Sequence, residues 1–252
     1  MNKIKTSVVS YLNTLPFLYG IEQSNIKNEI DLSLDIPSVC AKKLIHKEVD
    51  FGLVPVAILP ELKESHIISD FCIGCEGKVQ TVSLFSNVPI EEIESIYLDY
   101  QSRTSNILLQ ILLKEFWKVS PAILKSDIGY ETKIKDKTAA LVIGNRAFTI
   151  AKKAKYEYDL GEAWLAFTGL PFVFAAWVSN KVLPESFIKT FNFALDQGVN
   201  NIDKALHNLA PMNQAEINRN SNYLKENISY KLDEQKQKGL EKFLNYLPDF
   251  SS

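Results

Sequence analysis

Short apolar segments alternate with amphipathic ones along the chain, and this alternation predicts strands followed by helices. Apolar or alternating runs of strand length occur at Lys3–Val9, Glu29–Ile36, Phe51–Val54, His66–Ile73, Lys78–Ser86, Ile93–Leu98, Ala139–Ile143 and Phe172–Val178. Helical spacing with polar residues suited to a first turn occurs at Asn13–Ile21, Ser38–His46 and Thr104–Trp117, and Leu232–Leu247 is expected to form a terminal helix despite Gly239. Strands that alternate with helices predict an α/β fold with mainly parallel sheets.

The chain changes character after the last of these strands, because from Pro184 onward the spacing is helical. There is no repeat and no Gly/Ser-rich linker, so a second domain has to form by the chain crossing over and returning. We expect a discontinuous lobe made of residues 1–88 plus 179–252, with the C-terminal helices returning to it. Residues 89–178 are expected to form the second lobe.

The charge balance excludes several classes of partner. The 252 residues carry 28 Lys+Arg against 30 Asp+Glu, a net charge of −2, without blocks of like charge. This gives no electrostatic footprint for nucleic acid or an anionic membrane. The longest apolar stretch, Gly169–Val178, is well short of the ~20 residues that span a bilayer, and the first residues are too polar for a signal peptide. We expect a cytoplasmic protein.

Metal and thiol chemistry have little support. Cys72 and Cys75 form a C-x-x-C pair that a redox or zinc site could use, but zinc sites generally need a second pair or added histidines. His46, His66 and His207 show no metal-ligand spacing. We therefore expect no metal and no other cofactor.

Polar turns between strands and helices offer the clearest candidate for ligand binding. Four such turns carry small hydroxyl or amide side chains, and they lie at residues 10–14, 37–38, 102–105 and 144–146. Helix N-termini beyond parallel strands attract anions, although Ser, Thr and Asn are also ordinary N-cap residues. Arg103 and Arg146, two of the three arginines, lie in these turns and could bind a carboxylate or clamp one lobe against the other. Both interpretations stay open.

Familiar catalytic signatures are missing: there is no G-x-S-x-G, no Gly-rich phosphate loop and no H-E-x-x-H. Asp159 and Glu162 could form an acid/base pair, but next to a helix start such residues more often complement the helix dipole. The residues by themselves thus predict a two-lobed protein that binds an anion.

Five ordered blocks resemble the chorismate dehydratase family of the futalosine route to menaquinone. They are Ser10-Tyr11-Leu12-Asn13-Thr14-Leu15-Pro16, Asp50-Phe51-Gly52-Leu53-Val54-Pro55-Val56, Gly74-Cys75-Glu76-Gly77-Lys78-Val79, Ser102-Arg103-Thr104-Ser105 and Thr168-Gly169-Leu170-Pro171-Phe172-Val173-Phe174-Ala175. The resemblance implies an α/β, two-lobed type II periplasmic-binding-protein-like fold with the active site in the cleft between lobes. It also implies elimination of water from chorismate to give 3-[(1-carboxyvinyl)oxy]benzoate.

The same resemblance assigns roles to individual residues. The family's essential asparagine matches Asn13, and Thr81 stands where the family has a functional serine. Thr104 and Ser105 look like anchors for a substrate carboxylate, and Ser38 is a further candidate of the same type. The family proposal is that the substrate's own side-chain carboxylate takes the proton. Asn145 replaces an aspartate common in the family, so no acid role is assigned there.

Two other functions remain as alternatives. The related 1,4-dihydroxy-6-naphthoate synthase shares the fold, but that family uses a catalytic histidine in the second lobe, where this chain has none. A cytosolic solute-binding module for an aromatic carboxylate would have the same fold without turnover. The oligomeric state cannot be read from the sequence.

Overall fold

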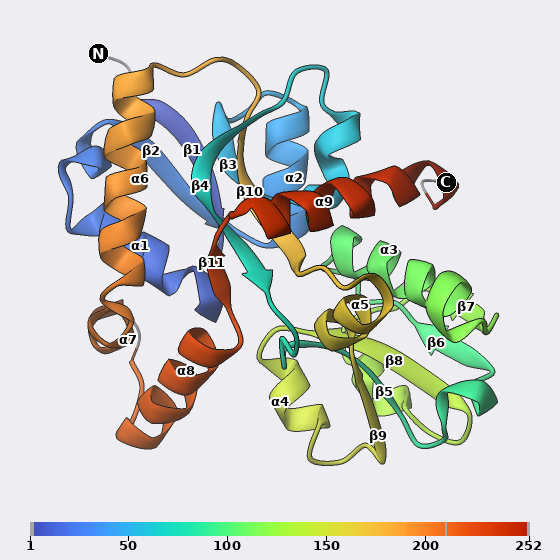
Figure 1. The fold of residues 1–252 in the computed structure, drawn as a ribbon. Helices are drawn as coiled ribbons and strands as arrows, with labels where there is room; N and C mark the ends of the chain where they lie inside the picture. The colour runs from blue at the N-terminus through green and yellow to red at the C-terminus, as the bar shows by residue number, and fades with distance from the viewer. Residues whose placement is uncertain (1–2, 210, 251–252) are drawn as a thin grey trace. The chain divides into compact units, whose positions relative to one another are not determined.

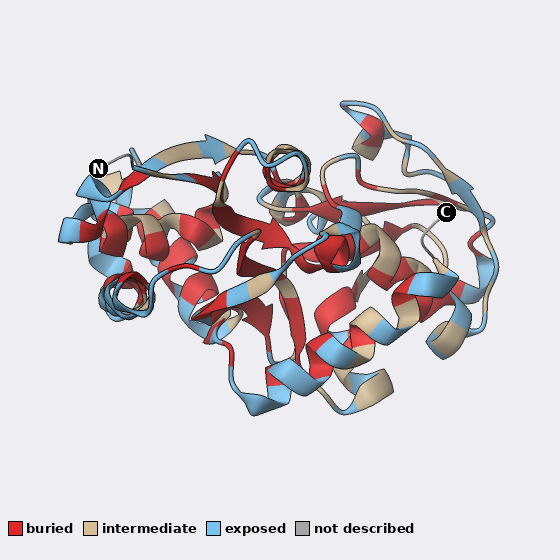
Figure 2. Ribbon diagram, turned by 90° about the horizontal axis from the view of Figure 1, so that it is seen from above, coloured by how far each residue is buried: buried red, intermediate tan, exposed pale blue. Residues whose placement is uncertain are grey.

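Two β-sheets organise the chain, and each lies in its own unit (Figure 1). The computed structural model describes residues 3–209 and 211–250. The first unit comprises Met1–Gly74 and Val173–Glu234, and the second comprises Cys75–Phe172 and Gln235–Ser252. In Figure 2 the central strands of the sheets are buried and the helices expose their outer faces.

The first unit has a six-stranded sheet in the order β11-β4-β10-β3-β1-β2. Its strands are β1 (Ile4–Val9), β2 (Ile30–Asp35), β3 (Phe51–Pro55), β4 (His66–Cys75), β10 (Phe172–Ser179) and β11 (Ser229–Lys231). β1 runs parallel to β2 and β3, whereas β10 is antiparallel to β3 and β11 to β4. The helices are α1 (Leu15–Glu22), α2 (Pro37–Ile45), α6 (Glu185–Val199), α7 (Ile202–Leu209) and α8 (Gln214–Glu226), with 3₁₀ helices at Leu12–Thr14, Asn25–Asn28 and Val56–Glu61.

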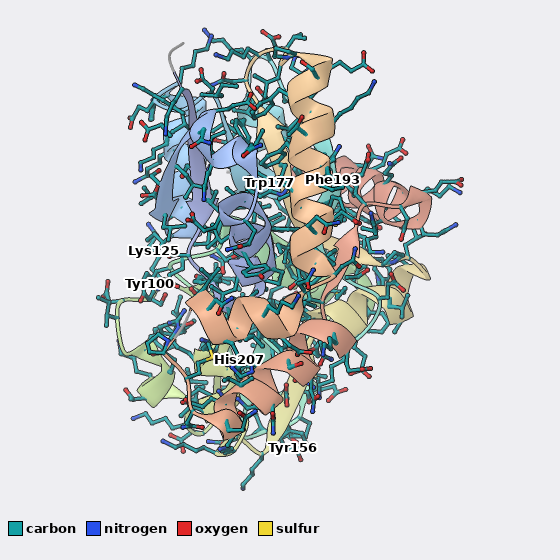
Figure 3. The ribbon with its side chains drawn as sticks, turned by 90° about the vertical axis from the view of Figure 1, so that its left-hand side faces the viewer. Tyr100, Lys125, Tyr156, Trp177, Phe193 and His207 are labelled. Carbon is teal, nitrogen blue, oxygen red and sulfur yellow. The ribbon has the colours of Figure 1, made fainter. Side chains whose placement is uncertain are left out.

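An aromatic cluster forms the core between this sheet and its helices. The Trp177 ring on β10 lies 4.8 Å from that of Phe191 on α6 and 5.7 Å from that of Phe17 on α1, both edge to face. Phe193, two residues beyond Phe191, is 63% exposed because it lies on the outer face of α6 (Figure 3). Helix α6 is thus amphipathic, with one face in the core and the opposite face in solvent.

Helices α1 and α6 pack so closely that side chains are excluded at their crossing (Figure 1). A Cβ atom at Gly20 would lie 1.9 Å from the Ala194 carbonyl oxygen, and one at Gly198 would lie 1.9 Å from that of Pro16. The two glycines therefore allow a backbone-to-backbone contact that no other residue permits.

The second unit has a five-stranded sheet in the order β7-β6-β8-β5-β9. Its strands are β5 (Val82–Ser86), β6 (Ser95–Tyr97), β7 (Ala122–Leu124), β8 (Thr138–Ile143) and β9 (Tyr156–Asp159). β6 runs parallel to β7 and β8, and β5 is antiparallel to β8 and β9. The helices are α3 (Arg103–Ile111), α4 (Arg146–Ile150), α5 (Leu160–Thr168) and α9 (Glu234–Tyr246), with a π-helix at Leu112–Trp117 and 3₁₀ helices at Ile90–Glu92, Tyr130–Lys133 and Leu247–Asp249.

The terminal helix α9 groups with the second unit, whereas the sequence pattern assigned it to the first lobe. The Phe243 ring packs edge to face 5.1 Å from that of Phe172 and 6.3 Å from that of Trp164. The fully buried Lys236 ammonium lies 2.6 Å from the Glu76 carboxylate. These contacts hold α9 to the second unit, and none of them is visible in the spacing of the helix itself.

The unit boundaries also differ from the expected lobes at 88 and 179. Residues 75–88 belong to the second unit because β5 pairs with β8 and β9. Residues 173–178 belong to the first unit because β10 pairs with β3. β5 runs antiparallel to β8 and β9, and β10 runs antiparallel to β3, so the sheets are mixed rather than mainly parallel.

Most predicted elements are present within a residue or two, and the exceptions are local. The strand expected from Lys78 begins only at Val82, and the helix expected to reach Trp117 changes from α to π geometry after Ile111. β7, β9 and β11, which have three or four residues each, were not predicted. No helix among the described residues is long and apolar enough to cross a membrane.

Candidate functional site

Asn13 follows the carboxyl end of β1 in the first unit. The Ser10 N–H and hydroxyl both donate to the Asp35 carbonyl, at 2.9 and 3.3 Å, and fix the chain where it leaves the strand. Asn13 is half-buried in the 3₁₀ turn Leu12–Thr14. Its carbonyl accepts a 3.0 Å hydrogen bond from the Tyr230 hydroxyl on β11. Tyr230, which sequence reasoning did not single out, thus helps to hold the Asn13 backbone.

The side chain of Asn13 does not cap a helix. Thr14 is the N-cap of α1, and neither the 3₁₀ turn nor α1 has a side-chain cap hydrogen bond. Within the described part of the chain, the Asn13 amide makes one long hydrogen bond, with its Oδ1 accepting from Thr14 Oγ1 at 3.5 Å. The capping interpretation of this turn is therefore wrong, and the amide is available for another partner.

Ser38 lies in the first turn of α2, beyond the carboxyl end of β2. The N-cap of this helix is Ile36, so Ser38 does not cap it. Nearby, the Asp35 carboxylate accepts from Lys43 Nζ at 2.6 Å and from the Ser7 and Ser33 hydroxyls at 2.8 Å. Burial raises the pKa of Asp35, but hydrogen bonds from Lys43 and the two serines outweigh it, and the pKa is lowered.

Thr81 lies in the second unit, directly before β5, and is 4% exposed. Its carbonyl accepts a 2.8 Å hydrogen bond from the Gly144 N–H, which follows β8. The register of the sheet pairs Val82 with Ile143, so Thr81 lies at the edge where β8 ends. The Thr81 side chain therefore shares this edge with the turns that follow the parallel strands.

Thr104 and Ser105 lie in the first turn of α3 and are 1% and 2% exposed. Ser102 is the N-cap: its Oγ accepts from the Ser105 N–H at 3.1 Å and donates to Ser105 Oγ at 2.9 Å. Ser102 thus provides the cap and takes up the third N–H of the helix, while the helix terminus keeps its partial positive charge.

Arg146 is committed to a buried ion-pair cluster inside the second unit. Its guanidinium lies 2.6 Å from the fully buried Asp99 carboxylate and also pairs with Glu131. It stacks 5.4 Å from the ring of Tyr100, which is labelled in Figure 3, and 5.8 Å from that of Tyr130. Each of these partners belongs to the same unit, so Arg146 braces that unit internally.

Asp99 is the centre of this cluster, and sequence reasoning missed it. Its carboxylate accepts from the Tyr130 hydroxyl at 2.6 Å, the Gln101 N–H at 2.8 Å and the Ile143 N–H at 3.2 Å. Burial and the negative charge of Asp99 raise the pKa of Tyr130 far above its usual range, so the phenol stays protonated. The available signal was an aspartate directly after a strand, which the search for hydroxyl-rich turns passed over.

The predicted residues therefore lie at the carboxyl edges of the two sheets. Asn13 and Ser38 belong to the first unit, and Thr81, Thr104 and Ser105 belong to the second. Arg103 is exposed at the start of α3. A groove of about 500 Å³ in the first unit contains none of them, since leucine and isoleucine side chains of α1 and β2 line most of it.

The three cysteines are buried free thiols. Burial raises the pKa of Cys40 to about 11 and that of Cys75 to about 12. Cys72 and Cys75 lie three residues apart on β4, where side chains at that spacing point to opposite faces. No group of three or more His, Cys, Asp or Glu side chains within 3–209 and 211–250 could hold a metal ion.

Comparison with known proteins places the chain in a family. A family model described as menaquinone biosynthesis matches residues 4–249. The chain belongs to the menaquinone biosynthesis family. A chorismate dehydratase from Thermus thermophilus is 27% identical over 167 residues, which are 59% of this chain and 61% of that protein. The match thus spans about three fifths of the relative's length.

Solved structures show how this member of the family folds. The protein AF1704 from Archaeoglobus fulgidus matches with a TM-score of 0.72 at 14% identity, over 99% of this chain and 97% of that one. The CA3427 gene product of Candida albicans, described as having the generic periplasmic binding protein fold, matches with a TM-score of 0.64 at 11% identity, over 100% of this chain and 92% of that one. The predicted α/β, periplasmic-binding-protein-like fold is confirmed.

Proposed function

We propose that the protein is a chorismate dehydratase, a cytoplasmic hydro-lyase that converts chorismate to 3-[(1-carboxyvinyl)oxy]benzoate and water. The observation that carries the proposal is the state of Asn13, the residue that matches the family's essential asparagine. Asn13 is half-buried beyond the carboxyl end of β1, and its side chain caps no helix. Membership of the menaquinone biosynthesis family and the similarity to the Thermus thermophilus enzyme support the same assignment.

The reaction places modest demands on the protein. The hydrogen on C3 of chorismate is acidified through the ring diene by the ring carboxylate, and loss of that proton together with the C4 hydroxyl makes the ring aromatic. The proton passes to the substrate's side-chain carboxylate, which returns it to the departing C4 hydroxyl, so that the hydroxyl leaves as water and the carboxylate is regenerated. Because the proton acceptor belongs to the substrate, the protein has to hold chorismate in one reactive conformation rather than supply a strong base.

The candidate residues suit that task. The Asn13 amide carries a donor and an acceptor that can orient the substrate by hydrogen bonds. The first turn of α3, with Thr104 and Ser105, offers hydroxyls and a positive helix end to a carboxylate. Thr81 supplies a hydroxyl with one more methyl group than the family's serine, and Ser38 is a further hydroxyl at the start of α2. No metal or cofactor is assigned a role.

One alternative in the same pathway is disfavoured by the placement of the histidines. The 1,4-dihydroxy-6-naphthoate synthase resemblance calls for a catalytic histidine in the second lobe. His46, His66 and His207 all belong to the first unit. The second alternative, a solute-binding module for an aromatic carboxylate, shares every feature of the fold and differs only in lacking turnover.

A matched pair of substitutions tests the role of Asn13. Asn13→Ala should abolish turnover of chorismate with little change in stability, because no cap is lost. Asn213→Ala removes a true cap, since Asn213 and Glu216 form a reciprocal capping box at α8. That control should lose about 1 kcal/mol of stability and keep full turnover. Undiminished turnover in a folded Asn13→Ala variant would contradict the assignment.

A further inference from the structure

The segment that leads into Thr81 adopts a backbone conformation that ordinary residues avoid. Gly77 has φ +137° and Gln80 has φ +63°, so two left-handed residues occur within the four that precede Thr81. A non-glycine residue in this region costs about 1–2 kcal/mol and persists only where its surroundings hold it. Something in the second unit must therefore stabilise residues 77–80.

The Asp159 carboxylate is what holds this segment. Its Oδ2 accepts the Gln80 N–H at 2.7 Å, and its Oδ1 accepts the Val79 N–H at 3.1 Å. The same Oδ1 accepts the Gly161 and Glu162 N–H groups at 3.0 and 3.1 Å, which is the N-cap of α5. Asp159 is 4% exposed, so these backbone donors replace the water that a carboxylate would otherwise need.

A helix cap alone does not require this arrangement. Two other side-chain caps, those of Ser102 and Asn213, each accept from a single backbone N–H of their own helix. Asp159 additionally binds two N–H groups of a turn about 80 residues earlier in the chain. The role at a helix start that the sequence suggested thus accounts for the bonds from Gly161 and Glu162, and the bonds from Val79 and Gln80 need a further explanation.

Close packing makes the link between helix and turn rigid. A Cβ atom at Gly161 would lie 2.5 Å from both the Gly77 carbonyl oxygen and Cys75 Sγ, so the start of α5 rests directly on the turn. On its other side, Thr81 is fixed by the 2.8 Å bond from Gly144 to its carbonyl. The backbone of Thr81 is therefore held from α5 on one side and from the end of β8 on the other.

We propose that Asp159 is a positioning residue that sets the place of the Thr81 hydroxyl through its bond to Gln80. This rests on the proposed function, in which Thr81 acts on chorismate. The acid/base role for Asp159 and Glu162 is not supported, since the Asp159 oxygens are occupied by backbone donors. Asp159 instead acts through geometry, and a displacement of about 1 Å at Thr81 is enough to lower the rate by a large factor.

Asp159→Asn separates the two halves of the carboxylate. Asparagine is about as good a helix cap as aspartate, so its Oδ1 can keep the bonds from Gly161, Glu162 and Val79, and only the bond from Gln80 is lost. Its Nδ2 would then face the Gln80 N–H, donor against donor, in place of the 2.7 Å bond. Asp159→Ser is the second variant, because serine also caps but cannot reach two segments at once.

The test measures kcat and KM for chorismate in the intact protein, with Asp159→Asn, Thr81→Ala and the double variant. We expect Asp159→Asn to lower kcat by about tenfold with Thr81 present and by less than about twofold in the Thr81→Ala background, because it acts through that hydroxyl. Equal fold-losses in both backgrounds would overturn the proposal, since a merely structural role affects both alike.

Amide hydrogen exchange distinguishes failure of this inference from failure of the proposed function. In Asp159→Asn the Gln80 amide should exchange at least about tenfold faster, whereas the Gly161 and Glu162 amides should keep their protection. Unchanged exchange at Gln80 would overturn the positioning role whatever the activity. Absence of turnover in the unsubstituted protein would contradict the proposed function while leaving the exchange result interpretable.

Discussion

Replacement of Arg146 by methionine tests whether the Asp99 cluster braces the second unit. Methionine keeps the aliphatic part of the side chain, but it is too short to place a group where the guanidinium lies over Tyr100 and Tyr130, and it removes the charge. Asp99 then loses its 2.6 Å partner and keeps the bonds from Tyr130, Gln101 and Ile143. Because those three remain, the cost should fall below that of a fully unpaired buried charge.

The magnitude follows from the parts that are lost. A hydrogen bond to a charged group contributes about 1.5–3 kcal/mol, and the value here should lie toward the lower end because the Arg146 side chain is 30% exposed. Loss of the ion pair with Glu131, whose side chain is 12% exposed, adds up to about 1 kcal/mol, and loss of stacking on the two tyrosine rings adds about 0.5–1 kcal/mol. The sum is about 2–4 kcal/mol, which corresponds to a fall in Tm of roughly 5–15 °C for a chain of this size.

Differential scanning calorimetry at neutral pH gives the result directly. Lys137→Met is the matched control. It removes a lysine whose Nζ lies 2.6 Å from the Glu94 carboxylate in a solvent-exposed ion pair, so the Tm of this variant should equal that of the unsubstituted protein. Arg146→Met with a Tm no lower than that control would refute the reasoning, because Arg146 would then not stabilise the unit.

Two further predictions concern the thiols and the acid side of the stability curve. The native protein should react with a thiol reagent far more slowly than the unfolded chain, in which all three cysteines are exposed. Burial raises the pKa of Cys75 to about 12, so only about one part in 10⁴ of this thiol is ionised at pH 8. Rapid labelling of Cys72 or Cys75 in the folded protein would contradict this prediction. Because the pKa of Asp35 is lowered in the folded state, its contribution to stability is present above the unfolded value of about 3.9 and is lost as pH falls through the folded value. The difference in urea midpoint between the unsubstituted protein and Asp35→Asn should therefore shrink from pH 7 to pH 3, and a constant difference would contradict the role of the Lys43 contact.

Sequence patterns anticipate the elements better than they anticipate the partners of each element. The strand from Ile4 to Val9 and the helix from Pro37 to Ile45 follow from local periodicity, and both are present. Helix α9 has an equally clear pattern, but which unit it joins depends on Phe172, Trp164 and Glu76, which are distant in sequence. Long-range packing of this kind is not encoded in the spacing of one segment.

The candidate site shows the same division. The polar turns at Asn13 and Thr104 are recognisable because small hydroxyl and amide residues follow apolar strands. Whether such a residue caps a helix depends on one hydrogen bond, which Ser102 makes and Asn13 does not. Sequence reasoning missed Asp99 and recognised only the place of Asp159 at a helix start. Each carboxylate accepts hydrogen bonds from backbone N–H groups of a distant segment, 44 residues away for Asp99 and about 80 residues away for Asp159.

The most direct test of the account is to incubate the purified protein with chorismate, without added metal or cofactor, and to follow the mixture by chromatography and proton NMR. A sample without enzyme and one with the Asn13→Ala variant run beside it. The account predicts accumulation of 3-[(1-carboxyvinyl)oxy]benzoate in the first sample alone. Chorismate left unconverted would contradict the dehydratase assignment, and unconverted chorismate that raises the Tm of the protein would favour the binding module instead.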